Sequence, residues 1–246
     1  MGSYVQGDEV PVYESGAEVL QMLQQKCRSS SSSMPAAAAA MYSSVLGGII
    51  LDPAMMLLPV DDHMVHRGHG VFDTAMLLDG CLYELDPHLD RFLRSAARAR
   101  IASPFPRDTL RSILIRMTAA SGCRRGSIRY WLSAGPGDFL LSPKGCPSPA
   151  FYAVVIPAEY EQCREGVRAV TTSVPMKPPL FATTKNAKRS VEMAFVGSGL
   201  PVLPIVEWDG QPIGDGKVGD LMLALSDLLW EDMKSGPDRI AVPYTN

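Results

Sequence analysis

The chain of 246 residues contains 46% hydrophobic and 20% charged residues, a composition typical of a globular protein. Its formal net charge of -3 argues against a nucleic acid or another polyanion as the main partner and favours a small molecule or a protein. The five cysteines are widely spaced and form no CxxC pair, which argues against a disulfide framework or a zinc site.

Residues 1–44 are predicted to be an N-terminal extension. A helix-like segment, GAEVLQMLQQKC, precedes a low-complexity stretch of serine and alanine, SSSSSMPAAAAA. Asp8 and Glu9 argue against a secretory signal and an organellar transit peptide, so we expect a cytoplasmic protein, with a plastid as the alternative. The apolar run over 47–60 is interrupted by an aspartate and two prolines and is too short to cross a bilayer.

From residue 45 onward, short apolar runs alternate with turn residues. Residues 70–85 predict a β-hairpin, because two β-prone arms flank Asp79 and Gly80, a dipeptide that supplies positive φ angles in a tight turn. The segment DPHLDRFLRSAARARI that follows has apolar residues at helical spacing and basic residues opposite them, and a second helix is predicted over 106–121, ending before Gly122.

The remaining elements are predicted to be strands and one helix. Strands are expected over 127–135, 150–157 and 166–175, followed by a second Asp-Gly turn and a helix over 218–233. This order predicts an α+β fold with an N-terminal α+β domain over 45–174 and a C-terminal domain over 175–246.

Lys185 lies in the segment PLFATTKNAKRS and could be a reactive amine or a solvated surface charge. A lysine alone is a weak indicator of a functional site, because most lysines keep a hydrated ammonium group at the surface. The surrounding motifs have to decide between these interpretations.

Five segments in chain order together resemble the fold-type IV, or class IV, pyridoxal-phosphate-dependent aminotransferases. They are HRGHGVFDT, the first Asp-Gly hairpin, DPHLDRFLRSA, FATTK and WDGQPIGDGKVG. This family includes branched-chain and D-amino-acid aminotransferases and aminodeoxychorismate lyase, and the likeness is to its plant-type members. The resemblance implies a two-domain homodimer that binds pyridoxal 5'-phosphate and transfers an amino group from an amino acid to a 2-oxo acid.

The resemblance assigns roles to particular residues. Lys185 matches the family's Schiff-base lysine, which needs a primary amine that can also move a proton. Arg91 matches the arginine that binds the cofactor phosphate, since a guanidinium can meet two phosphate oxygens in one plane. Ser198 and Gly199 lie in GSGLPVLP, which resembles a second phosphate-binding loop but could be an ordinary turn.

Two further residues are assigned to the substrate. Arg129 stands where branched-chain aminotransferases carry an inward-facing arginine, and Phe72 matches an apolar wall of the pocket. Arg129 could instead be an exposed strand charge, and Phe72 could be a plain core residue. The loop GPGDF lacks the Arg and His pair with which D-amino-acid enzymes hold the substrate carboxylate, so the substrate stays open.

Two family motifs are absent from the 246 residues. One resembles EGxxxN and supplies the glutamate that pairs with the pyridine nitrogen of the cofactor, and the other resembles GxTR and binds the phosphate. Their absence predicts an internal deletion, such as a splice variant, that leaves the C-terminal domain incomplete. We therefore expect weak or no activity, and the alternatives are an aminodeoxychorismate-lyase-like enzyme and a non-catalytic relative acting through its N-terminal domain.

Overall fold

The structure is a computed structural model that describes residues 12–30, 38–171, 193–197 and 200–245. Its larger part is a seven-stranded sheet with the strand order β11-β4-β3-β5-β6-β1-β2, in which every neighbouring pair is antiparallel. The strands are β1 (Ala40–Ser43), β2 (Gly48–Ile50), β3 (Gly70–Leu78), β4 (Cys81–Tyr83), β5 (Gly126–Ser133), β6 (Ala150–Pro157) and β11 (Arg239–Ala241).

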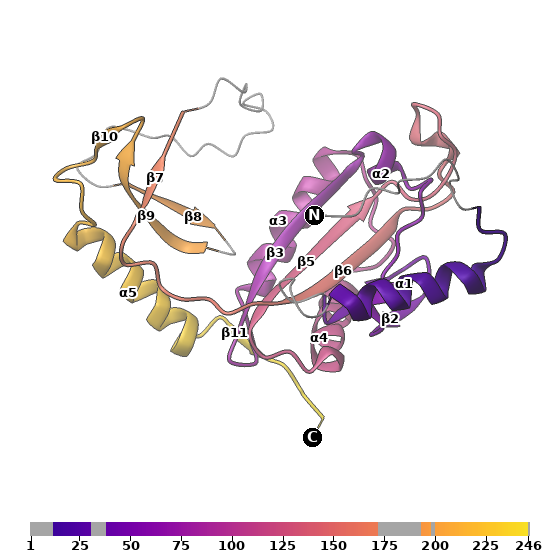
Figure 1. Ribbon diagram of the computed structural model, residues 1–246, viewed down its shortest axis with the longest axis horizontal. Helices are drawn as coiled ribbons and strands as arrows, with labels where there is room; N and C mark the ends of the chain where they lie inside the picture. The colour runs from indigo at the N-terminus through magenta and orange to yellow at the C-terminus, as the bar shows by residue number, and fades with distance from the viewer. Residues whose placement is uncertain (1–11, 31–37, 172–192, 198–199, 246) are drawn as a thin grey trace.

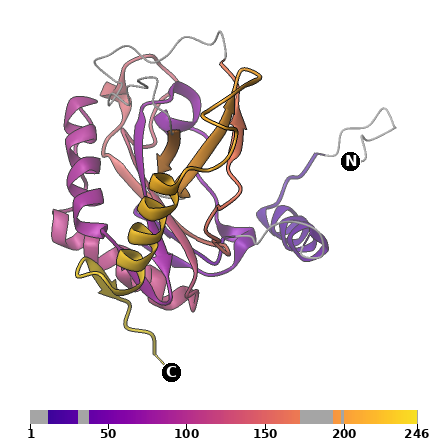
Figure 2. The same cartoon turned by 90° about the vertical axis from the view of Figure 1, so that its left-hand side faces the viewer.

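Two helices, α3 (Leu85–Arg98) and α4 (Arg107–Ser121), cover one face of this sheet (Figure 2). Successive strand residues point to opposite faces, so Ala75 and Leu77 of β3 enter the core beneath the helices. Phe92 of α3 and Leu114 of α4 are fully buried against them. Burial of such side chains, at about 25 cal/mol per Å² of apolar surface, is the main force that holds the layers together.

The predicted hairpin is confirmed. Asp79 and Gly80 have φ angles of 49° and 75°, the left-handed conformation that this type of turn requires. The predicted helix over 106–121 is also confirmed as α4, which ends at Gly122 with a φ angle of 67°.

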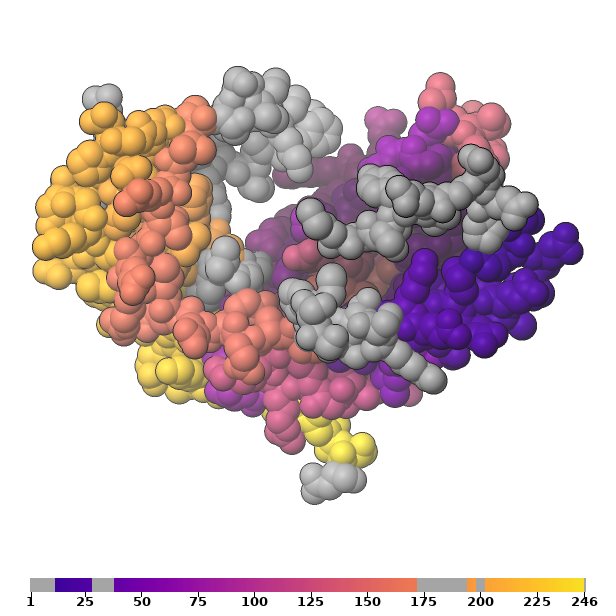
Figure 3. Space-filling model, viewed as in Figure 1, coloured from indigo at the N-terminus to yellow at the C-terminus, as the bar shows by residue number. Residues whose placement is uncertain are grey.

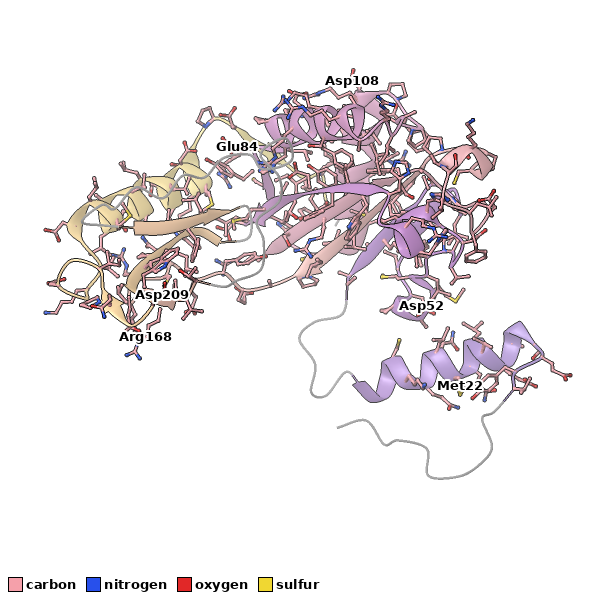
Figure 4. The ribbon with its side chains drawn as sticks, turned by 90° about the horizontal axis from the view of Figure 1, so that it is seen from above. Met22, Asp52, Glu84, Asp108, Arg168 and Asp209 are labelled. Carbon is pink, nitrogen blue, oxygen red and sulfur yellow. The ribbon has the colours of Figure 1, made fainter. Side chains whose placement is uncertain are left out.

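A smaller sheet follows in the C-terminal part of the chain. It contains β7 (Val167–Ala169), β8 (Met193–Gly197), β9 (Leu200–Trp208) and β10 (Gln211–Pro212), and α5 (Asp220–Ser235) packs beside β9. The predicted turn at Asp209 is confirmed, and the Asp209 carboxylate accepts hydrogen bonds from the backbone N–H and hydroxyl of Thr171 (Figure 4). This contact fixes the end of β7 next to the β9–β10 hairpin.

Contacts made by α5 and β11 join the parts of the molecule. Trp230 and Met233 of α5 pack on Met76 and Leu78, which lie on the face of β3 opposite α3. The strand β11 then adds to the large sheet beside β4. The small sheet and most of α5 nevertheless form a separate lobe beside the large sheet (Figures 1 and 3).

The N-terminal segment contributes one helix and one strand. The helix α1 (Gly16–Ser30) lies against η1 (Pro53–Met55), where the Gln24 amide donates to Asp52 at 3.4 Å (Figure 4). The strand β1 pairs with β6 and β2, so residues 40–43, which the sequence predicts to be part of the extension, lie within the large sheet. None of the described helices is long and apolar enough to cross a membrane.

Candidate functional site

The motif HRGHGVFDT runs from α2 (His63–Arg67) into β3, and it ends at an open edge of the large sheet. The strand β4 pairs only with residues 76–78 of β3. Residues 70–75 therefore have a strand neighbour, β5, on one side alone within the described part of the chain. In Figure 1, β3 lies on the side of the large sheet that faces the small sheet.

A charged cluster lies beneath this edge, on the face that α3 covers. The Asp73 carboxylate accepts hydrogen bonds from Arg91 Nε at 2.8 Å and from Arg91 Nη2 at 2.5 Å. His88 Nδ1 lies 3.0 Å from Asp73 Oδ1 and 2.8 Å from Arg91 Nη2. Because residues 88 and 91 are three apart, they share one face of α3 and meet the same carboxylate.

The cluster favours the charged forms of its acid and its arginine. Burial alone would raise the pKa of Asp73, but hydrogen bonds from His88, Arg91 and the Thr74 backbone N–H hold that pKa below its ordinary value. The hydrogen bond to Asp73 raises the pKa of the Arg91 guanidinium. Arg91 is therefore a permanent cation that is paired with a buried carboxylate.

Tyr130 lies on the same face and is fully buried. Its hydroxyl has no hydrogen-bond partner among the described residues, and burial raises its pKa above the ordinary range. Phe92 packs edge-on against its ring, with 4.9 Å between the ring centroids. Tyr130 is thus a buried, uncharged residue next to the charged cluster.

The two predicted substrate residues lie together on the other face of the sheet. Phe72 is 62% exposed, so the interpretation of Phe72 as a core residue is wrong. Arg129 of β5 stands opposite Thr74 and donates a long hydrogen bond of 3.4 Å to its hydroxyl. The sheet therefore separates Phe72 and Arg129 from Arg91.

The other predicted site residues are Lys185, Ser198 and Gly199. They lie outside the described residues. Their roles stay predictions that follow from the resemblance.

Sequence reasoning missed the buried residues that position the motif. Asp62 caps the first turn of α2 by accepting from the Met64 backbone N–H at 2.8 Å, and it also accepts from the Tyr152 hydroxyl at 2.7 Å and from the Ser133 hydroxyl. An aspartate before a helical turn is a recognisable capping signal, but the two hydroxyl partners come from distant strands. Asp73 was likewise missed, because it lies on a distant strand, whereas His88 lies three residues before Arg91 in the predicted helix and could have been found from that spacing.

A small cavity lies outside this cluster. A cavity of about 120 Å³, lined by residues 84–87 and 237–240, lies between the start of α3 and β11 and contains none of the predicted site residues (Figure 4 labels Glu84). Within the described ranges, no group of histidine, cysteine and acidic side chains could hold a metal ion. The Arg91 cluster at the β3 edge is therefore the best candidate for the site.

Comparison with known proteins identifies the class. Residues 70–197 match the family model described as amino-transferase class IV. The D-amino-acid transaminase, chloroplastic, of Arabidopsis thaliana is 42% identical over 296 residues, which cover 83% of this chain and 79% of that protein. The chain therefore belongs to the class IV aminotransferase family, as its motifs predicted.

The same alignment is longer than the 246-residue chain. It must therefore contain gaps in this chain opposite residues of the relative, as expected if the chain lacks an internal segment. A bifunctional aminodeoxychorismate lyase / D-amino acid transaminase of Mycobacterium tuberculosis is 30% identical over 163 residues, covering 61% of this chain and 54% of that protein.

Solved structures show the same fold. A branched-chain amino acid aminotransferase with pyridoxamine 5'-phosphate has a TM-score of 0.75 at 15% identity, covering 84% of this chain and 99% of that one. A branched-chain aminotransferase from the thermophilic archaeon Thermoproteus uzoniensis has a TM-score of 0.66 at 16% identity, covering 84% of this chain and 100% of that one. The predicted fold-type IV architecture is thereby confirmed.

Proposed function

We propose that this chain is a pyridoxal-5'-phosphate-binding aminotransferase that moves an amino group from an amino acid to a 2-oxo acid, with weak or no turnover. The observation that carries the proposal is the Arg91 guanidinium. Asp73 holds it along one edge, while half of its side chain stays exposed at the open edge of β3. A fixed, exposed guanidinium is suited to bind a phosphate group.

The residues present fit the phosphate of the cofactor. Arg91 Nη1 hydrogen-bonds to none of the described residues in the cluster, so its two N–H groups could meet phosphate oxygens. Ser198 and Gly199 would add a hydroxyl and backbone N–H groups from the second loop. When bound, the cofactor supplies an electron sink for the substrate carbanion.

The other residues would act on the substrate. Lys185 would carry the cofactor and move a proton between carbon atoms through its amine. Arg129 would hold the substrate carboxylate, and its pairing with Thr74 directs it toward the same face as Phe72. No step in this scheme uses a metal ligand.

Weak turnover is proposed because one part of the site has no counterpart in the sequence. The glutamate of the EGxxxN motif would keep the pyridine nitrogen protonated, and the 246 residues contain no such motif. The chain would then still bind the cofactor phosphate, but it would stabilise negative charge on the pyridine ring poorly. If that stabilisation is lost completely, the chain is a non-catalytic relative.

The amino donor is proposed to be a D-amino acid, because the 42% identical relative is named a D-amino-acid transaminase. The lack of an Arg and His pair in GPGDF weighs against it and favours an L-amino acid held by Arg129 as the second candidate. The name of the Mycobacterium tuberculosis relative supports aminodeoxychorismate lyase activity as a third. A homodimer follows from the resemblance, and the chloroplastic name of the Arabidopsis relative supports a plastid location over a cytoplasmic one.

The test is the binding of pyridoxal 5'-phosphate to the purified chain, measured by equilibrium dialysis. Arg91→Ala should weaken binding at least about tenfold, because it removes the phosphate ligand, whereas Arg94→Ala removes another arginine from the same helix and should leave binding unchanged. Borohydride reduction and peptide mass mapping should place the bound cofactor on Lys185. Modification scattered over several lysines, with equal affinities for both variants, would contradict the proposal.

Activity is tested separately with D- and L-alanine, branched-chain L-amino acids and aminodeoxychorismate. We expect turnover at least about a hundredfold below that of an aminotransferase that keeps the EGxxxN glutamate, because loss of a residue that tunes the cofactor removes stabilisation of the transition state. Turnover at the level of such an enzyme would show that the glutamate is replaced by another group.

A further inference from the structure

The way in which Arg91 is held suggests a role for Asp73. The guanidinium has five N–H donors. Nε and Nη2 both donate to the Asp73 carboxylate, at 2.8 and 2.5 Å, in a side-on bidentate contact. The second N–H of Nη2 has His88 Nδ1 at 2.8 Å, so the two donors of Nη1 are the ones without a partner in the described part of the chain and can meet a ligand.

The three side chains of the cluster also differ in burial, and Arg91 is the most exposed of them. The side chain of Asp73 is 4% exposed and that of His88 is 10% exposed, whereas that of Arg91 is 50% exposed. Asp73 is thus a fixed part of the strand, and Arg91 reaches from α3 across it to the surface. An arginine without this anchor would sample many rotamers, because its side chain has several rotatable bonds.

His88 completes the anchor in either protonation state. With a proton on Nδ1 the ring donates to Asp73 Oδ1 at 3.0 Å, and without it the ring accepts from Arg91 Nη2. The groups that face this ring nitrogen are therefore the Asp73 carboxylate and the Arg91 guanidinium. In both states the His88 ring contacts the Asp73–Arg91 ion pair.

We infer that Asp73 is a positioning residue that sets the affinity of this chain for a phosphate-bearing ligand by fixing Arg91. This inference rests on the proposed function, because it assumes that Arg91 binds the phosphate. Two effects of Asp73 oppose each other. Its negative charge weakens the attraction of Arg91 for an anion, and its bidentate contact removes the entropy cost of ordering Arg91 when the anion binds.

The sign of one substitution separates these effects. Asp73→Asn keeps the size of the side chain, removes its charge and leaves one acceptor for two donors. If positioning dominates, affinity for pyridoxal 5'-phosphate should fall about tenfold, the range expected when one flexible side chain must be ordered on binding. If charge dominates, affinity should rise, and the inference is then wrong.

Pyridoxal, which lacks the phosphate, is the matched ligand. Its affinity should be the same for the wild-type chain and Asp73→Asn, because Arg91 acts on the phosphate alone. The matched variant is Asp90→Asn, which removes an equal charge next to Arg91 on α3 from an acid paired with Arg107. It should leave both affinities unchanged. An equal loss with Asp90→Asn, or an equal loss for pyridoxal, would overturn the inference.

A double-mutant cycle tests whether Asp73 acts through Arg91. In an Arg91→Lys background the ammonium cannot form the side-on bidentate contact, so Asp73→Asn should change affinity for pyridoxal 5'-phosphate less than about twofold. A further tenfold loss in that background would contradict a positioning role. If Asp73→Asn fails to fold, His88→Gln takes its place, with an expected loss of about two- to threefold for the phosphate ligand only.

The wild-type measurement separates the two proposals. Absence of pyridoxal 5'-phosphate binding by the wild-type chain would reject the proposed function and the inference with it. Binding that depends on Arg91 but not on Asp73 would reject the inference and leave the proposed function in place.

Discussion

The hydroxyl of Tyr83 on β4 donates a hydrogen bond to the carboxylate of Asp232 on α5, across 149 positions of sequence. Burial, and next the contact with Asp232, raise the pKa of Tyr83 above its ordinary value. Trp230 and Met233 pack beside this bond on the face of β3. The last turns of α5 therefore contact the large sheet through an apolar cluster and through the Tyr83–Asp232 hydrogen bond beside it.

Tyr83→Phe should loosen this attachment. The substitution leaves Asp232 without its phenol partner, and a partly exposed hydrogen bond to a charged group contributes about 1–2 kcal/mol. Urea unfolding should show this loss in the free energy of unfolding. Tyr160→Phe is the matched control, because Tyr160 packs against the same cluster of buried residues. Equal losses in the two variants would show that the Asp232 contact adds nothing.

The buried Asp73 should control part of the acid stability of the fold. Its pKa is lowered in the folded chain from an ordinary value of 3.8, so its ion pair stabilises the fold above that value and is lost as the pH falls through the folded-state pKa. Chemical unfolding between about pH 2 and 5 should show a declining free energy of unfolding that is flatter in Asp73→Asn.

Asp108→Asn is the control for this titration. The Asp108 side chain is 95% exposed, so its substitution should leave the slope with pH unchanged. A wild-type slope in Asp73→Asn would mean that other carboxylates cause the acid sensitivity.

Local sequence signals predicted most of the elements around the site. Three features depend on short stretches of sequence, and the structure confirms all of them: the Asp79-Gly80 turn, the apolar spacing of α3 and the end of α4 at Gly122. The strand over 150–157 is confirmed with the predicted bounds. These features depend on local φ preferences and on side-chain periodicity, which a single sequence carries.

The sequence did not reveal contacts between distant segments. β1 begins within a run of alanines that resembles a linker, and its pairing with β6 and β2 makes it a strand. β11 has three residues and forms because β4 offers it an edge. In the site, Arg91 was predicted from its motif, but its anchor Asp73 lies on a strand face that no local pattern distinguishes.

The network of Asp62 gives the last prediction. Asp62 is fully buried and accepts from the Met64 backbone N–H, the Ser133 hydroxyl and the Tyr152 hydroxyl, so it joins α2 to two strands of the large sheet. Asp62→Ala should lower the free energy of unfolding by about 3 kcal/mol, because it leaves buried donors unpaired and removes a helix cap. Asp61→Ala removes the neighbouring acid, which accepts from His66 through its backbone carbonyl, and should cost about 0.5 kcal/mol or less. Equal unfolding midpoints in urea for the two variants would mean that water replaces the lost carboxylate and that α2 does not depend on this network.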